Sequence, residues 1–207
     1  MVKTIIIFSP HNDDLEIGMG GTVLKYIDEG YKIIKVVLSA GQSSNPHLRT
    51  DVIIKQREKE ALLVAKKFKI HKTVFYRLSD QNLNEELIIV RDKILNVIEK
   101  EKPEKIFLPT AVDFHPDHKA TFNFVMDLIK DMNIEVYCYE VWSISDEKHP
   151  HVYIDITDYL KNKLKMMDMF KTEKLSIFIQ TLPVLYRAWK FGRKINKKFA
   201  ERFYKIK

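Results

Sequence analysis

Short apolar runs alternate with segments of helical periodicity through most of this chain, and this alternation limits the folds that it can adopt. The runs that predict strands are residues 3–8, 31–39, 73–78, 106–108 and 135–142. The segments that predict helices are residues 20–29, 51–69 and 87–100, with a further helix after His118. Strands that alternate with helices form parallel βαβ units. The sequence therefore predicts an α/β fold of three layers, with a Rossmann-like, doubly wound and mostly parallel sheet.

The predicted strand order is 3-2-1-4-5, a common one for a doubly wound sheet, in which the first and fourth strands are neighbours. After Pro150 the pattern changes to a strand over residues 152–156, a helix over 158–174 and a basic C-terminal helix. We therefore expect an added C-terminal strand and helices. Residues 1–207 are predicted to form a single domain, with a Rossmann-like core at 1–142 and an extension at 143–207 that packs on the core.

Histidine and carboxylate residues follow two of the predicted strands. His11, Asp13 and Asp14 come directly after the first strand, and His115-Pro116-Asp117-His118 follows the fourth. Imidazole and carboxylate groups are costly to bury unless they bind a partner, and ligand sites in this fold class form at strand ends. We therefore interpret the two clusters as halves of one metal site. His149-Pro150-His151 is the weaker candidate for the second half, because no carboxylate lies between its histidines.

The two clusters are expected to meet, because neighbouring parallel strands carry their loops to the same edge of the sheet. His11, Asp14 and His118 then form a set of two imidazoles and one carboxylate, which on catalytic zinc leaves a fourth position for water. Pro116 suits the first position of a helix and keeps His115 extended. The same ligand types suit non-haem Fe(II) oxygenases. Those enzymes use an H-x-D spacing on all-β scaffolds, unlike this chain, and metal content decides between the two.

Three glycines, Gly18, Gly20 and Gly21, come soon after the first cluster. They do not match the G-x-G-x-x-G fingerprint of dinucleotide-binding folds, and no acidic residue ends the second predicted strand. We interpret them as a glycine-rich turn that permits close packing of the first helix beneath the site.

Composition limits the ligands and the compartment that are available. The 207 residues are 45% hydrophobic, enough to bury a sizeable core, and Cys138 is the single cysteine. One cysteine allows neither an internal disulfide nor a cysteine-rich metal cluster, so metal ligands must be His, Asp or Glu. The N-terminal apolar run is too short for a secretory signal, and no run approaches the roughly 20 residues that span a bilayer. We expect a cytoplasmic location.

The net charge of +7 is concentrated near the C-terminal end. Residues 187–207 hold nine Lys or Arg and one acid, Glu201, so the remainder is nearly neutral. In one interpretation the chain is a non-enzymatic protein whose basic, aromatic-rich tail binds an anionic membrane surface or nucleic acid. In the other the tail is an amphipathic helix with Ile195, Phe199 and Phe203 facing inward. No nucleic-acid partner is expected, whereas peripheral membrane contact through the tail stays open.

The two clusters carry a resemblance to a known family. Pro10-His11-Asn12-Asp13-Asp14 is similar to the P-H-x-D-D motif of the PIG-L (LmbE-like) family, and residues 115–118 match its H-P-D-H motif. Weaker matches are Arg57, Glu60, Asp80 and the segment Glu201-Arg202-Phe203. The resemblance covers the chain to about residue 142. It implies a zinc-dependent hydrolase that removes the acetyl group from an N-acetylglucosamine-type amino sugar, as a glycoside or glycolipid, giving acetate and a free amine.

The resemblance also implies roles for the residues of the two motifs. The implied ligands of one Zn²⁺ per chain are His11, Asp14 and His118. Asp13 is implied as the general base, since it is adjacent to a ligand and can take a proton from water and deliver it to the leaving amine. His115 is implied as the oxyanion stabiliser, and we expect it to be protonated and oriented by Asp117.

Arg57 and Asp80 are the candidates for substrate binding. Arg57 lies in the second predicted helix, where it binds sugar hydroxyls or an acidic aglycone, or is simply an exposed helix arginine. The expected partner is an N-acetylated amino sugar, and a homo-oligomeric state stays open.

Overall fold

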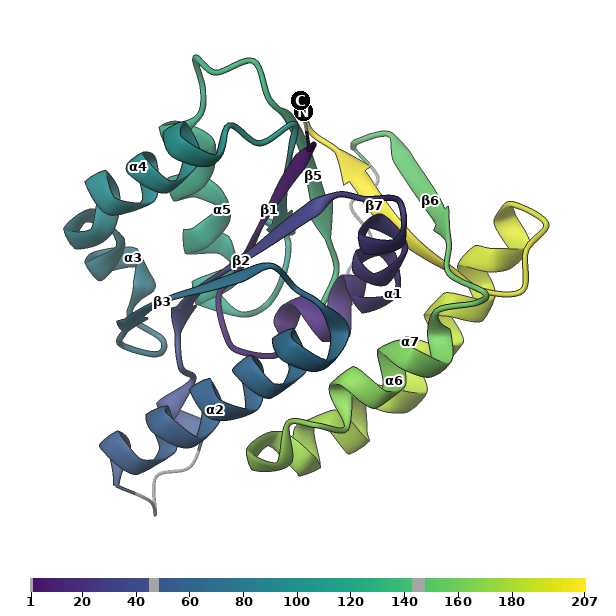
Figure 1. Cartoon of the computed structure of the whole chain (residues 1–207), viewed down its shortest axis with the longest axis horizontal. Helices are drawn as coiled ribbons and strands as arrows, with labels where there is room; N and C mark the ends of the chain where they lie inside the picture. The colour runs from purple at the N-terminus through teal and green to yellow at the C-terminus, as the bar shows by residue number, and fades with distance from the viewer. Residues whose placement is uncertain (1, 45–48, 143–147) are drawn as a thin grey trace.

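The computed structural model describes residues 2–44, 49–142 and 148–207 and confirms the α/β fold. Its sheet has seven strands in the order β3-β2-β1-β4-β5-β7-β6 (Figure 1). The strands are β1 (Thr4–Ser9), β2 (Lys32–Ser39), β3 (Lys72–Leu78), β4 (Lys105–Pro109), β5 (Glu135–Tyr139), β6 (His151–Asp155) and β7 (Ala200–Lys205). The first five are parallel and have the predicted order. Two added strands extend the sheet, whereas one was expected, and β7 runs antiparallel to both β5 and β6.

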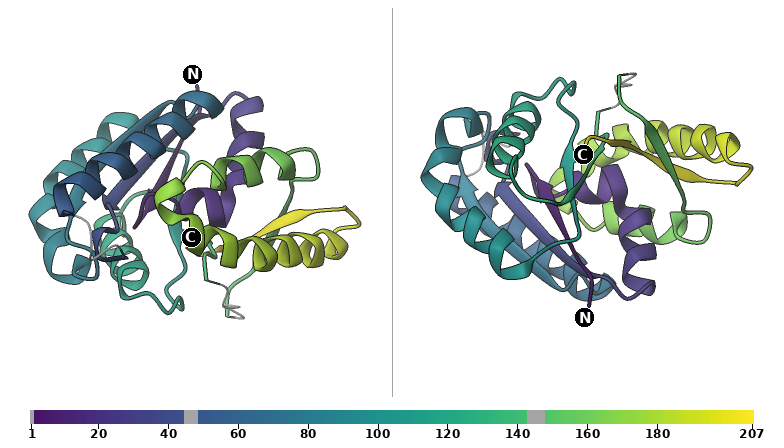
Figure 2. Two further views of the ribbon diagram at one scale, coloured as in Figure 1. Left: turned by 90° about the horizontal axis from the view of Figure 1, so that it is seen from below. Right: turned by 90° about the horizontal axis from the view of Figure 1, so that it is seen from above.

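Helices cover both faces of this sheet, as a doubly wound fold requires (Figure 2). They are α1 (Asp14–Asp28), α2 (Thr50–Phe68), α3 (Leu83–Glu86), α4 (Arg91–Glu101), α5 (Pro116–Leu128), α6 (Leu160–Met167) and α7 (Lys174–Lys194). Strand β1 shows why both faces are covered. Ile5 and Ile7 pack into a core shared with α1, α2, α6 and α7, whereas Ile6 and Phe8 pack into a second core with α4 and α5. Within the described ranges, no helix is both long enough and apolar enough to cross a membrane.

Helix α1 begins at the first histidine cluster, which corrects the prediction of a turn there. The glycines lie inside the helix, which kinks at Met19 (φ −144°, ψ 20°). The predicted close packing is confirmed. A Cβ atom on Gly18 would collide with the Tyr139 ring, and one on Gly21 would lie 2.9 Å from side-chain atoms of Ile156. The glycines therefore let the helix that begins at the site approach β5 and the start of the C-terminal helical segment.

The kink in α1 is stabilised by the C-terminal extension. The backbone N–H groups of Gly21 and Thr22 donate to the carboxylate of Glu201 at 3.1 and 2.7 Å. Lys163 of α6 donates to the same carboxylate at 2.5 Å, so the charge of this buried acid is balanced. The Glu201-Arg202-Phe203 segment, a weak motif in the sequence, thus supports the helix that carries the site.

The extension differs most from the sequence prediction. The predicted strand at 152–156 is confirmed as β6, but the helix predicted over 158–174 ends at Met167, and the basic C-terminal helix ends at Lys194. Asn196 has a φ of 55°, a left-handed conformation that asparagine tolerates and that cannot continue a helix. Phe203 is buried, as predicted, but in β7 and not in a helix. A strand is favoured there because the edge of β5 offers unpaired backbone groups.

Candidate metal centre and catalytic pocket

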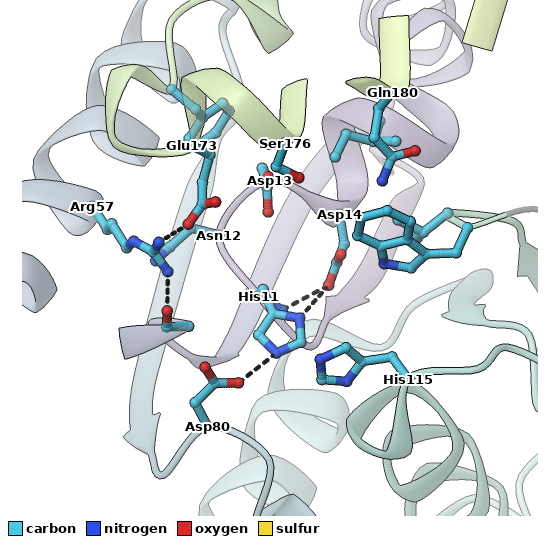
Figure 3. A pocket seen from close by; sticks show the side chains of 15 residues that line it. His11, Asn12, Asp13, Asp14, Arg57, Asp80, His115, Glu173, Ser176 and Gln180 are labelled. Carbon is cyan, nitrogen blue, oxygen red and sulfur yellow. Dashed lines mark hydrogen bonds and ion pairs between the residues drawn. The ribbon is translucent and has the colours of Figure 1, made fainter. Parts of the chain in front are cut away.

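The loops after β1 and β4 meet at one edge of the sheet, because these strands are parallel neighbours. The first loop enters α1 at Asp14, and the second enters α5 at Pro116, with His115 in an extended conformation before it (φ −74°, ψ 124°). The two histidine clusters come together as predicted (Figure 3). The ring centroid of His11 lies 4.6 Å from that of His115 and 5.6 Å from that of His118.

Two of the three predicted metal ligands, His11 and His118, converge on the third, the carboxylate of Asp14. Its Oδ2 lies 3.3 Å from Nδ1 of His11, and its Oδ1 lies 3.4 Å from Nε2 of His118. The His118 ring is fully buried, and its Nε2 has no hydrogen-bond partner in the described part of the chain. Buried polar atoms without a partner are rare and need an explanation. Two imidazoles and a carboxylate in this arrangement fit a divalent metal ion.

A second set of carboxylates lies behind the two histidines. Nε2 of His11 is 3.1 Å from Oδ1 of Asp80 and 3.3 Å from Oδ2 of Asp117. Nδ1 of His118 is 3.1 Å from Oδ2 of Asp113. An imidazole that gives its N–H to a carboxylate keeps its other nitrogen for a metal, and here that nitrogen faces Asp14 in both cases. Metal-ligating histidines commonly have such carboxylate partners.

These carboxylates make the centre a site for positive charge. Burial alone would lower the pKa of His11, but Asp14 and the other acids raise it well above its usual value. Burial also opposes protonation of His118, yet Asp14 and Asp113 raise its pKa to about 9. Burial would raise the pKa of Asp80, but His11 outweighs this effect and the pKa falls to about 2. The pKa values of Asp14 and Asp113 are lowered as well, so these two acids and Asp80 are ionised at neutral pH.

Asp13 is buried and lines the same cavity, but it is not part of the ligand cluster. Burial and then the nearby Asp14 raise the pKa of its carboxyl group. Among the residues that Figure 3 draws, no hydrogen bond or ion pair holds its carboxylate. A buried carboxylate with a raised pKa, beside a metal site, is suited to accept and return a proton.

His115 is oriented by Asp117, but not in the way that the sequence predicts. The backbone N–H of Asp117 donates to Nδ1 of His115 at 3.3 Å, so in a neutral ring the proton is on Nε2. The Asp117 carboxylate instead accepts from the backbone N–H groups of Gln81 at 2.8 Å and Leu83 at 3.2 Å. Burial and then His11 lower the pKa of His115. The contact with the backbone N–H of Asp117 and the lowered pKa therefore favour a neutral His115 ring over the protonated ring that we expected.

Both predicted substrate-binding residues line the cavity, but their contacts are with the protein itself. Arg57 is buried, not an exposed helix arginine; it donates to the carbonyl of Ala40 at 2.7 Å and to that of Gly41, and it pairs with Glu173. Asp80 faces His11, and its Oδ2 accepts from the backbone of Ser43 at 3.0 Å. These contacts support the walls of the cavity, and a role of either residue in substrate binding stays a prediction.

The cavity above the metal centre has a volume of about 270 Å³. Residues of the C-terminal extension complete its wall, and the sequence analysis missed them: they are Phe170, Glu173, Ser176 and Gln180. It also missed Asp113. The sequence could have pointed to this acid, because it lies two residues before His115 in the same loop. The weaker candidate pair is elsewhere, because His151 begins β6 and its ring packs on Tyr204 with centroids 5.2 Å apart.

Comparisons with known proteins show which family this chain is similar to. The family model PIG-L, described as GlcNAc-PI de-N-acetylase, matches residues 6–129. A diacetylchitobiose deacetylase of Thermococcus kodakarensis is 27% identical over 188 residues, which are 79% of this chain and 67% of that protein. The chain therefore spans about two thirds of the length of this relative.

Solved structures share the fold of the whole chain. The N,N'-diacetylchitobiose deacetylase of Pyrococcus horikoshii superposes with a TM-score of 0.84 at 23% identity, over 99% of this chain and 84% of that one. The 4-carboxy-2-hydroxymuconate hydratase GalB of Pseudomonas putida superposes with a TM-score of 0.80 at 16% identity, over 100% of this chain and 97% of that one. At these identities the likeness concerns the fold alone.

Proposed function

Since this chain belongs to the PIG-L family of GlcNAc-PI de-N-acetylases, we propose that it is a metal-dependent hydrolase of the N-acetyl amide bond in an N-acetylglucosamine-type sugar. The products are acetate and the free amino sugar. One observation carries the proposal: His11 and His118 converge on Asp14 beneath a cavity that Asp13 and His115 also line. This cavity thus combines a metal ligand set with a proton-transfer group and a hydrogen-bond donor.

The residues that would hold the metal are His11, through Nδ1, His118, through Nε2, and the carboxylate of Asp14. When bound, the ion supplies Lewis acidity, which lowers the pKa of a water molecule and polarises the amide carbonyl. Asp80 and Asp117 hold the His11 ring, and Asp113 holds that of His118, so that the ligand nitrogens are presented in one orientation. One Zn²⁺ per chain stays the prediction from the sequence.

Asp13 moves the proton in this mechanism. Its carboxylate takes a proton from the attacking water and later gives it to the nitrogen of the departing amine. Burial keeps the pKa of this carboxyl group raised, which brings it closer to the range in which it can both accept and donate. A positioned acid–base group of this kind contributes roughly 10² to 10⁴ in rate.

His115 stabilises the carbonyl oxygen of the amide as negative charge develops on it. Because Nδ1 accepts the backbone N–H of Asp117, the neutral ring has its proton on Nε2 and donates it as a hydrogen bond. A neutral donor retains its proton through the reaction, so it does not compete with Asp13 for proton transfer.

Two polar groups in the cavity wall suit a substrate with hydroxyl groups. In the described part of the chain, Nε2 of Gln180 and Oδ1 of Asn12 are buried without a hydrogen-bond partner, and both residues line the cavity. Nε2 of Gln180 is a hydrogen-bond donor and Oδ1 of Asn12 is an acceptor. Each sugar hydroxyl can both donate and accept a hydrogen bond. Polar residues of this kind in the wall support a saccharide over an apolar amide.

The decisive experiment measures acetate release from a panel of N-acetylglucosaminides, including monosaccharides, chito-oligosaccharides and glycolipids. The metal-loaded protein and the chelated protein are compared, and the metal content of the purified protein is determined. We expect acetate from at least one substrate, loss of activity on chelation and recovery with Zn²⁺. Equal acetate release before and after complete chelation would exclude the metal-dependent mechanism. No acetate release from any substrate of the panel would exclude the proposed deacetylase activity. Cytoplasmic location stays a prediction, and the oligomeric state stays open.

A further inference from the structure

One face of α7 is apolar and exposed. Six large side chains lie on it, with exposed fractions of 73% for Leu175, 76% for Phe178, 58% for Ile179, 75% for Leu182, 59% for Tyr186 and 46% for Trp189. We call these six residues the α7 apolar face. They are spaced by one, three or four residues, which at 3.6 residues per turn places them in an arc of about 100° along the helix.

The opposite face of α7 packs on the protein, so the exposed residues are not needed for the core. Ile177, Val184, Ala188 and Phe191 are all buried. Figure 2 shows α7 on the outside of the molecule, beside α6. An exposed, contiguous apolar patch of this kind is uncommon on a soluble domain and marks an interaction surface.

The charged residues of α7 and of the short segment after it are all basic. Between residues 174 and 198 the chain has seven Lys or Arg and no Asp or Glu. Five of the basic residues come after Trp189, and the guanidinium of Arg193 lies 5.2 Å from the centroid of the Trp189 ring. Leu and Phe therefore occupy the N-terminal part of the apolar face, and Tyr, Trp and basic residues the C-terminal part. This is the pattern of helices that lie in the surface of an anionic membrane.

We propose that the α7 apolar face docks on the surface of an anionic phospholipid bilayer, with α7 in the plane of the interface. The apolar side chains enter the boundary between headgroups and acyl chains, and the basic residues contact the anionic headgroups. Charge favours this partner over a second copy, since two such faces would bring like charges together. The apolar side chains favour it over nucleic acid, which offers a polar, charged surface.

Docking would bring the active-site cavity close to the membrane. Ser176 and Gln180, on the same helix, line that cavity, as does Trp142, whose side chain is partly exposed. Substrates carried in a membrane would thus meet the site at the surface on which the protein rests. The docking itself is independent of the proposed reaction, and it is measured without substrate.

The test is co-sedimentation of the full-length protein with vesicles of equimolar phosphatidylglycerol and phosphatidylcholine, compared with vesicles of phosphatidylcholine alone. Salt is raised from about 0.1 M to about 1 M, which shortens the screening length from roughly 10 Å to 3 Å. We expect binding to the anionic vesicles that weakens with salt. Phe178→Ser/Leu182→Ser should weaken it by roughly tenfold or more, and Lys190→Gln/Arg193→Gln/Lys194→Gln should remove most of its salt dependence.

Ile88→Ser/Ile89→Ser is the matched control, because these side chains are 65% and 71% exposed but lie on the opposite face of the sheet, between α3 and α4. It should bind vesicles like the parent. A second readout needs no α7 variant: in Trp142→Phe, the emission of Trp189 should shift to the blue when anionic vesicles are added. Failure to bind at low salt, or equal binding by the α7 variants, would overturn the proposal. So would self-association that Phe178→Ser/Leu182→Ser abolishes while vesicles are not bound.

Discussion

The loops after β1 and β4 each bring one histidine to Asp14, but they hold it differently. The side chain of His11 is 13% exposed, and its Nε2 lies near two carboxylates, those of Asp80 and Asp117. The side chain of His118 is fully buried, and its Nδ1 lies near that of Asp113. The first histidine therefore has redundant support, whereas the second depends on one acid and on packing.

The two loops are also interlocked. Asp14 of the first loop contacts His118 of the second, and Asp117 of the second loop contacts His11 of the first. Neither loop forms its half of the site alone, because each supplies an acid to the histidine of the other. We expect the strongest effects on metal binding and activity from residues that link the two loops. The weakest effects are expected where two carboxylates support the same histidine.

The largest effect is expected from His118→Ala. The variant should lose bound metal, and with it more activity than the roughly 10² to 10⁴ expected for losing a proton-transfer group. Metal content and acetate release measure both. His151→Ala is the matched control, since this histidine lies at the start of β6, and it should retain metal. A His118→Ala protein with full metal content would remove His118 from the ligand set.

Asp13→Asn should retain metal and lose activity by roughly 10² to 10⁴, because the amide keeps the shape of the side chain but cannot take the proton. The comparison with His118→Ala separates the proposed proton transfer by Asp13 from the proposed metal binding by His118. Acetate release at the rate of the parent protein would show that another group is the base.

His115→Ala should lower kcat by roughly 10² to 10³, the range for removing one donor to an oxyanion, with metal content unchanged. His115→Gln, whose amide can also donate a hydrogen bond, should recover part of this loss. If the two variants are equally impaired, the histidine acts by something other than hydrogen-bond donation.

The smallest effects are expected at the carboxylates behind the histidines, and they test the asymmetry directly. Asp113→Asn should weaken metal affinity by roughly 10- to 100-fold, the usual cost of losing a carboxylate behind a ligand. Asp80→Asn should cost less, because Asp117 still faces Nε2 of His11. Competition with a chromophoric chelator gives both affinities. Equal losses of metal affinity in the two variants would show that Asp117 does not substitute for Asp80. The support of His11 would then not be redundant.

Much of the core and of the metal centre could be predicted from the sequence. The strand order and the meeting of the two histidine clusters follow from the alternation of strands and helices, because strand ends in a parallel sheet share one edge. Asp14 and His118 could be proposed as metal ligands, since they stand next to strand ends. Arg57 shows what the sequence could not predict. Its residue type suggested a substrate-binding residue or an exposed helix arginine, but its contacts with Gly41 and Glu173 depend on segments far apart in the sequence.

The C-terminal extension resisted prediction for a physical reason. Residues 200–205 have no strong strand pattern of their own, and they form β7 because the edge of β5 is open to them. Glu201 had no assigned role until the fold placed it against the kink in α1. Likewise, the periodicity of residues 174–194 predicts an amphipathic helix but not which apolar residues face outward.

The sequence by itself predicted the chemistry: which side chains are the candidate metal ligands, which is the candidate proton-transfer group and which strand ends carry them. These predictions depend on the types of the residues and on their positions along the sequence, which can both be read without a structure. Only the tertiary structure decided how the groups are paired. The neutral form of His115, the acids assigned to each histidine and the exposed face of α7 depend on contacts between segments that are distant in sequence. Burial and charge act on the assembled site, and a linear pattern does not contain them.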